Sequence, residues 1–236
     1  MVSQKRPGWK AALGLIILWS FVLPPIPTRA ADFEKWEKEI AAYEQADRTS
    51  LPPKGGLLFI GSSTIRLWKT LAHDFPQHNV INRGFGGSQI VDSTHFAERI
   101  IFPYAPRMIL LRAGGNDIHA GKSPELVFSD FRAFVAKVHE KLPDTQIAYI
   151  ALSPSIARWD EKEKGEALNR MIREYTREIA GFKYIAAESI SLGSDGKPRP
   201  ELFVADKLHF SPEGYKLLAE SVRPHLPKYW MVTSGE

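Results

Sequence analysis

Two adjacent serines have the residue type and the position that nucleophilic catalysis requires. Ser62 and Ser63 follow the apolar residues 57–60 and Gly61, and a helical pattern begins directly after them. A serine at that point holds its hydroxyl at the edge of a sheet and its amide at a helix N-terminus, where developing negative charge is favoured. The alternative is that one of the two hydroxyls only caps the helix. Taken alone, the motif favours the cap, because serine is a preferred cap residue.

Glycines and an asparagine in two later segments offer groups that can bind an oxyanion. Gly84, Gly86 and Gly87 let the backbone adopt positive dihedral angles and bring bare amides close to a ligand. They do not form a dinucleotide-binding loop, because the third glycine of that fingerprint would fall at Gln89. A tight strand-to-helix turn explains them equally well. Asn116 follows two further glycines, and its side-chain amide could donate to an oxyanion or form an Asx-turn.

A carboxylate and an imidazole lie three residues apart near the C-terminal end of the sequence. Asp206 and His209 fall in a predicted turn, directly before a serine, a proline and a glutamate at 211–213 that are typical of a helix start. In such a turn both side chains can face one point, as a general base and its partner would. A histidine between two apolar residues is more often partly packed than catalytic, so this pair alone is weak support for catalysis.

Short apolar runs alternate with helical patterns, and this alternation predicts how the four segments are positioned. Strands that alternate with helices are joined by right-handed crossovers into a parallel sheet covered on both faces. We therefore predict one three-layer α/β/α domain with about five parallel strands, whose carboxyl ends bring the four segments to the edge where such sheets bind ligands. The predicted strands cover residues 56–60, 80–81, 108–111, 146–152 and 182–186, and the predicted helices cover residues 33–46, 64–72, 90–100, 124–142, 162–180 and 212–225.

The set of four segments, in this order, resembles the motifs of the SGNH, or GDSL-type, hydrolase family, which is named for its serine, glycine, asparagine and histidine. The resemblance covers residues 56–225 and implies a flavodoxin-like α/β/α fold and a serine esterase or acylhydrolase activity. The first motif of the family usually reads Gly-Asp-Ser-Leu, whereas this chain has Gly61-Ser62-Ser63-Thr64. Ser62 is therefore a rival nucleophile, although spacing favours Ser63. A Gly-x-Ser-x-Gly elbow is absent, which argues against an α/β-hydrolase.

The resemblance implies roles for five residues. Ser63 is the implied nucleophile, His209 the general base and Asp206 the carboxylate that orients the base. The Ser63 amide, the Gly87 N–H and the Asn116 side-chain amide are the implied oxyanion donors. Such a reaction needs no metal and no organic cofactor. The other histidines do not have the paired spacing of metal ligands.

The first thirty residues have the layout of a signal peptide. Three basic residues precede residues 11–23, a run of 13 apolar or weakly polar residues. Small residues at positions 28 and 30 favour cleavage after Ala30. This run is shorter than the roughly 20 residues that a membrane-spanning helix needs, so we expect no stable membrane span after processing. An uncleaved anchor is the alternative. We predict export of a periplasmic or extracellular hydrolase domain over residues 31–236, with a helical lead-in over residues 31–54.

Charge and composition exclude several other functions. The chain has 31 Lys and Arg against 27 Asp and Glu residues. Four of the basic residues lie in the predicted signal peptide, so the mature chain is balanced and we expect no nucleic-acid partner. The absence of cysteine excludes disulfides, thiolate metal sites and cysteine nucleophiles. The expected partner is a small-molecule, glycan or lipid ester substrate.

The substrate is the least constrained part of the prediction. Arg158 and Trp159 follow the predicted strand 146–152 and reach the same edge of the sheet, where they could line a pocket for a polar ester such as an acetylated sugar. A surface loop in which Trp159 packs on a helix is the alternative. We expect an enzyme that cleaves an acetyl or short acyl ester. A lysophospholipase or thioesterase on the same site and a non-catalytic exported binding module are the other hypotheses.

Overall fold

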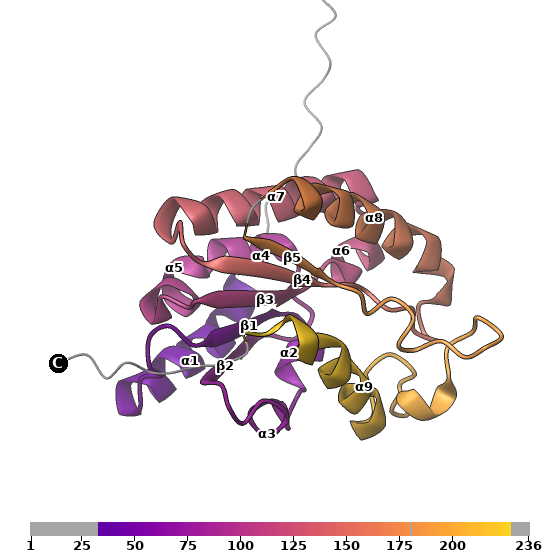
Figure 1. Cartoon of the computed structure of the whole chain (residues 1–236), viewed down its shortest axis with the longest axis horizontal. Coiled ribbons are helices and arrows are strands. Elements are labelled where there is room, and N and C mark those ends of the chain that lie inside the picture. The colour runs from indigo at the N-terminus through magenta and orange to yellow at the C-terminus, as the bar shows by residue number, and fades with distance from the viewer. Residues whose placement is uncertain (1–32, 180, 228–236) are drawn as a thin grey trace, which may run out of the picture. The chain divides into compact units, whose positions relative to one another are not determined.

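The computed structural model describes residues 33–179 and 181–227, and the predicted signal peptide lies outside the described residues. Five strands form one parallel sheet in the order β2-β1-β3-β4-β5 (Figure 1). This is the strand order of flavodoxin-like folds, which bind ligands beside the point where the order reverses, between β1 and β3. The strands are β1 (Leu57–Gly61), β2 (Val80–Gly84), β3 (Met108–Arg112), β4 (Gln146–Ile150) and β5 (Phe182–Ile185).

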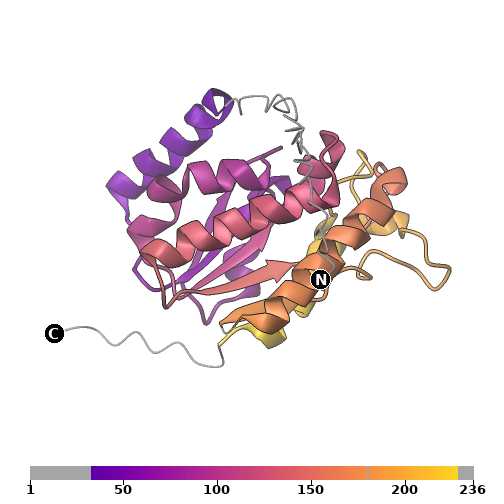
Figure 2. The same ribbon diagram turned by 90° about the horizontal axis from the view of Figure 1, so that it is seen from above.

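Both faces of the sheet are buried under helices, which confirms the predicted three-layer α/β/α fold. In β1, Leu58 and Ile60 pack on one face and Leu57 and Phe59 on the other, as the two-residue period of a strand requires. Figure 2 looks down on α7 and α8, which lie across the first face. The first face is covered by α1 (Glu37–Thr49), α4 (Ile90–His95), α5 (Ala97–Ile100), α7 (Pro124–Lys141) and α8 (Lys162–Glu178), and the second by α2 (Ser63–Arg66), α3 (Leu71–Asp74) and α9 (Pro212–Val222).

Helix boundaries differ from the prediction where tertiary contacts interrupt a helical pattern. The predicted helix 64–72 is the pair α2 and α3, because Trp68 between them is buried and its indole N–H donates to the Asp74 carboxylate at 2.6 Å. The predicted helix 90–100 is likewise divided into α4 and α5. A short helix, α6 (Gly115–His119), was not predicted. It begins after Gly114, whose positive φ of 114° starts the turn.

The N-terminal lead-in of the described chain is helical, as predicted. It consists of the short 3-10 helix η1 (Glu34–Trp36) followed by α1. No helix within residues 33–179 and 181–227 is long and apolar enough to cross a membrane.

The register of the sheet brings the ends of three strands together at one edge. Gly61, the last residue of β1, pairs with Gly84 at the end of β2 and with Arg112 at the end of β3. Gly61 has a φ of 140°, and a Cβ atom there would lie 2.0 Å from the Arg112 carbonyl oxygen. Only glycine fits this position. The segments that follow the three strands therefore start side by side.

Candidate active site

Ser63 is the first residue of α2 and follows the carboxyl end of β1. Its Oγ lies 2.8 Å from Nε2 of His209, a residue 146 positions further along the chain. Ser62 immediately precedes the helix, but its side chain makes no capping hydrogen bond. The Ser63 hydroxyl thus faces an imidazole, and the helix begins without a serine side-chain cap.

Asp206 and His209 form a hydrogen-bonded pair beside the Ser63 hydroxyl. Oδ2 of Asp206 lies 2.6 Å from His209 Nδ1, and Oδ1 accepts the backbone N–H groups of Leu208 and His209, each at 2.9 Å. The hydrogen bond with His209 is the main cause that lowers the pKa of the Asp206 carboxyl to about 2, against a smaller opposing effect of burial. The ionised carboxylate accepts a hydrogen bond from the Nδ1–H group, which leaves Nε2 available to accept a proton from Ser63.

Backbone hydrogen bonds hold the loop that carries this pair. The Val204 N–H donates to the His209 carbonyl at 2.9 Å, and the Lys207 N–H donates to the Val204 carbonyl at 2.9 Å. Lys207 takes the left-handed conformation, with a φ of 59°. Phe203 and Phe210 flank the loop and stack with their centroids 5.7 Å apart. The loop is therefore anchored at its base, and the imidazole orientation is fixed by Asp206.

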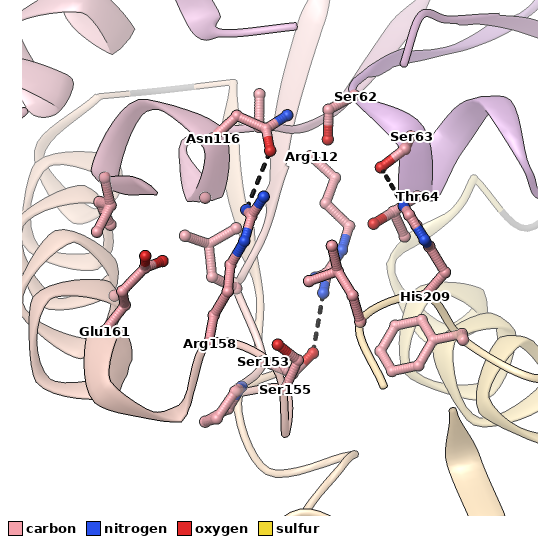
Figure 3. Close-up of a pocket in the computed structure, with 18 of the residues that line it drawn as sticks. Ser62, Ser63, Thr64, Arg112, Asn116, Ser153, Ser155, Arg158, Glu161 and His209 are labelled. Atoms are coloured by element: carbon pink, nitrogen blue, oxygen red, sulfur yellow. Dashed lines mark hydrogen bonds between the residues drawn. The ribbon is translucent and has the colours of Figure 1, made fainter. Parts of the chain in front are cut away.

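Asn116, in α6, lies on the other side of the two serines from His209 (Figure 3). Its Nδ2 donates to the Ser88 carbonyl at 3.0 Å, and its Oδ1 accepts from Arg158 Nη1 at 3.0 Å. These two bonds fix the orientation of the amide and leave one of the two Nδ2 hydrogens for a ligand. The Asn116 side chain is thus bonded to two other segments and does not serve as the alternative Asx-turn.

Gly87 lies in the glycine-rich segment after β2 and lines a cleft together with Ser63, Asn116 and His209. Its φ is 77°, so the positive dihedral expected for this segment is present at this residue. A Cβ atom at Gly87 would lie 3.2 Å from Cη2 of Trp36, which comes from η1. Glycine is therefore favoured here both by its conformation and by the close approach of the indole.

The residues at this edge surround a cavity of about 120 Å³, shown in Figure 3. Arg158 lines it, as expected from the sequence. Trp159 does not belong to its lining. The residue is 39% exposed, and the Lys162 ammonium lies 5.8 Å from the centroid of its ring. The structure therefore brings Ser63, Asn116, Arg158 and His209 together at the cavity and places Trp159 outside it.

Arg112 also lines the cavity, although the sequence predicted no role for it. Its residue exposure is 5%, and its guanidinium donates to the Ala151 carbonyl and, at 2.9 Å, to Ser153 Oγ. Burial lowers the pKa of this group to about 10, so it is still a cation at neutral pH. The available signal was an arginine directly after the apolar run 108–111, at the carboxyl end of a predicted strand.

The lead-in was predicted as a helix without a functional role, yet it reaches the site. Glu39 of α1 lines the same cleft as Gly87, and its carboxylate lies 3.8 Å from Nε of Arg66. An amphipathic pattern says which face of a helix is buried but not what lies beside it, so no sequence signal identified Glu39. Within the described ranges, no three His, Asp or Glu side chains are grouped so as to hold a metal ion.

Comparison with known proteins gives a family match that covers most of the chain. The model of the GDSL-like lipase/acylhydrolase family matches residues 60–217. No curated protein matches the sequence.

Several solved structures have the same fold at low sequence identity. A Streptococcus pneumonia protein described as a platelet activating factor superposes with a TM-score of 0.73 at 20% identity, over 83% of this chain and 94% of that one. A GDSL-like lipase from Bacteroides thetaiotaomicron has a TM-score of 0.65 at 16% identity, over 82% and 96% of the two chains. A variant of an acetyl-xylooligosaccharide esterase from Geobacillus stearothermophilus has a TM-score of 0.58 at 14% identity, over 76% and 99%. Matches at these identities concern the fold alone.

Proposed function

Because the chain belongs to the GDSL-like lipase/acylhydrolase family and is therefore an ester hydrolase, we propose that it cleaves a carboxylic ester by attack of Ser63 on the carbonyl carbon. His209 is the general base, and Asp206 orients it. The observation that carries this proposal is the continuous line of hydrogen bonds from Ser63 Oγ to His209 Nε2, at 2.8 Å, and from His209 Nδ1 to Asp206, at 2.6 Å.

The reaction proceeds in two halves. His209 Nε2 takes the Ser63 proton as Oγ bonds to the carbonyl carbon, and the imidazolium then protonates the leaving alcohol as the ester C–O bond breaks. The acyl group remains on Ser63. Water, deprotonated by the same imidazole, attacks the acyl carbon. The imidazolium then returns the proton to Ser63 Oγ as the bond between Oγ and the acyl carbon breaks and the carboxylic acid leaves. The ionised Asp206 stabilises the imidazolium in both halves.

The proposed oxyanion donors are the backbone N–H groups of Ser63 and Gly87 and the free Nδ2 hydrogen of Asn116. Support comes from the position of all three residues on one cleft and from the two bonds that fix the Asn116 amide. Losing one donor of this kind typically costs on the order of a hundred- to a thousandfold in turnover.

The substrate that we propose is an acetyl or short acyl ester of a polar alcohol, such as a carbohydrate. The cavity beside Ser63 has a volume of about 120 Å³, which suits a short acyl group. Polar side chains from three segments line it, including Asn116, Ser153 and Arg158. A structural neighbour is described as an acetyl-xylooligosaccharide esterase. The charged and hydrogen-bonding side chains in this lining favour a polar alcohol, so a lysophospholipase or thioesterase is the less favoured alternative.

We further propose that the enzyme is exported and acts in the periplasm or outside the cell. The support is the arrangement of basic residues, apolar run and small residues in positions 1–30. Intact-mass measurement of the protein recovered from outside the cytoplasm tests this, because cleavage after Ala30 removes a defined mass.

The choice between the two serines decides the mechanism and can be tested directly. Ser63→Ala is expected to abolish both hydrolysis of 4-nitrophenyl acetate and labelling by a fluorophosphonate. The reason is that Ser63, and not Ser62, has its hydroxyl within hydrogen-bond distance of His209. Ser62→Ala is the matched control and is expected to keep both. Labelling that disappeared only in the Ser62 variant would overturn the assignment of Ser63.

A further inference from the structure

Two arginines project into the cavity beside Ser63, and neither has a carboxylate partner. Among the described residues, no Asp or Glu oxygen lies within 4.0 Å of Arg112 or Arg158. Their hydrogen-bond partners are neutral: the Ala151 carbonyl and Ser153 hydroxyl for Arg112, and the Asn116 amide for Arg158. Figure 3 shows the Arg158 side chain reaching Asn116 and the Arg112 side chain between Arg158 and His209.

The acidic groups around the cavity are hydrogen-bonded to other side chains. Glu166 accepts from Lys162 at 2.6 Å, and Glu161 lies 2.6 Å from Nδ1 of His119. Glu161 also acts on Arg158, but only at longer range. Glu188, the carboxylate that acts on buried Arg112, is bonded to Arg173. The two guanidinium groups are therefore the positive charges of this cavity that lack a close counter-ion.

A buried cation without a counter-ion is costly, because neutral acceptors replace only part of the solvation it loses. Proteins therefore usually pair such groups. One structural explanation for Arg112 is its position 5.7 Å from the Phe210 ring, beside the loop that holds His209. That contact does not neutralise its charge, and the bond from Arg158 to the Asn116 amide oxygen does not neutralise the charge of Arg158 either.

We propose that the substrate carries an anionic group, a carboxylate or a phosphate, which Arg112 and Arg158 bind inside the cavity next to the scissile ester. This inference rests on the proposed esterase function and adds the charge of its substrate. A guanidinium has five N–H donors, and the bonds to protein leave several of them on each arginine for an anion. The ligand thus supplies the counter-ion that the chain lacks.

Two matched ester pairs test the proposal and show on which side of the ester the charge lies. Mono-4-nitrophenyl succinate and 4-nitrophenyl butyrate have the same leaving group and acyl length but differ in a carboxylate on the acyl side. Acetates of 4-hydroxyphenylacetate and 4-methylphenol differ in a carboxylate on the alcohol side. After subtraction of the rate without enzyme, kcat/KM is expected to be at least about tenfold higher for the charged member of one pair, as hydrogen bonds to a charged group are strong.

Variants assign this preference to the arginines. Arg158→Gln and Arg112→Gln are expected to bring the charged-to-neutral ratio close to one, whereas Arg158→Lys retains a preference. The charged-to-neutral ratio of kcat/KM is the informative quantity. A disturbance of Asn116 lowers kcat/KM for both esters and therefore cancels in this ratio. Arg132→Gln is the control, since it removes the same charge from the exposed surface of α7, and it is expected to leave the ratio unchanged. If Arg112→Gln does not fold, the two Arg158 variants decide.

The outcomes separate the two proposals. Hydrolysis of the neutral esters with a ratio near or below one for both pairs overturns the anionic substrate and leaves the esterase function intact. A high ratio that survives in Arg158→Gln and Arg112→Gln also overturns it. No hydrolysis of any of the four esters overturns the proposed esterase function, and this inference with it.

Discussion

Replacing Asn116 with alanine is expected to lower kcat by about a hundred- to a thousandfold and to leave KM within about threefold. The magnitude follows from the bonding of the amide. One Nδ2 hydrogen is used by the Ser88 carbonyl at 3.0 Å, so a single hydrogen is left to stabilise the oxyanion. Its loss costs about 3–4 kcal/mol of transition-state stabilisation. The two backbone donors remain, so residual activity is expected.

Asn116→Asp is expected to be at least as inactive as the alanine variant, although it is nearly isosteric. One carboxylate oxygen would accept from Arg158 as Oδ1 does now, but the other would face the Ser88 carbonyl and the developing oxyanion without a hydrogen. Repulsion between this carboxylate and the oxyanion, about 4 Å apart, raises the energy of the transition state by up to about 4 kcal/mol at the effective dielectric of a protein surface. The positive charge of Arg158 offsets part of this repulsion.

The assay is the steady-state hydrolysis of 4-nitrophenyl acetate, with the concentration of competent sites counted by fluorophosphonate titration. Asn169→Ala is the contrasting variant, because Asn169 also uses both ends of its amide, at 3.0 and 2.8 Å, but bonds only to the Leu152 backbone. It is expected to lower thermal stability more than turnover. If Asn116→Ala keeps more than about a third of wild-type kcat, or loses activity through KM alone, Asn116 is not an oxyanion donor.

Two further expectations concern pH and the edge of the sheet. The lowered pKa of Asp206, about 2, means that its carboxylate stabilises the fold above the ordinary aspartate pKa of about 4 and that this contribution is lost as pH falls toward 2. Acid unfolding followed by circular dichroism is therefore expected to show a loss in this window that is smaller in Asp206→Asn. Gly61→Ala would place a Cβ atom 2.0 Å from the Arg112 carbonyl oxygen, so the melting temperature is expected to drop by about 10 °C or more; an unchanged melting temperature would contradict the close approach.

Much of the fold and the site could be predicted because both depend on short-range patterns. Apolar runs that alternate with helical stretches specify a parallel sheet, and the carboxyl ends of its strands must lie at one edge. Ser63, Gly87 and Asn116 each follow such a run closely, so their convergence is a consequence of topology. Asp206 and His209 needed only a local turn to face the same point.

The parts that could not be predicted depend on contacts between distant segments. The helical pattern of residues 64–72 carries no sign that Trp68 is buried against the Asp74 side chain and ends the first helix. The sequence could not show which of the neighbours Arg158 and Trp159 points into the cavity. Side chains in a loop do not alternate between faces with a regular period, as they do in a helix or a strand. Arg112 ends a buried strand, and only the structure shows that its side chain turns into the cavity.

The distance in sequence between Ser63 and His209, 146 residues, also bears on how the enzyme matures. Contacts of such high sequence separation are entropically costly to close and slow folding. The part of the chain up to β4 contains Ser63, Gly87 and Asn116, but the proposed base arrives only with the loop before α9. On refolding from denaturant, recovery of hydrolysis therefore reports docking of the C-terminal segment, whereas far-ultraviolet ellipticity also reports structure formed before it. A chain that stops before this loop would contain the proposed nucleophile but lack the histidine proposed to activate it.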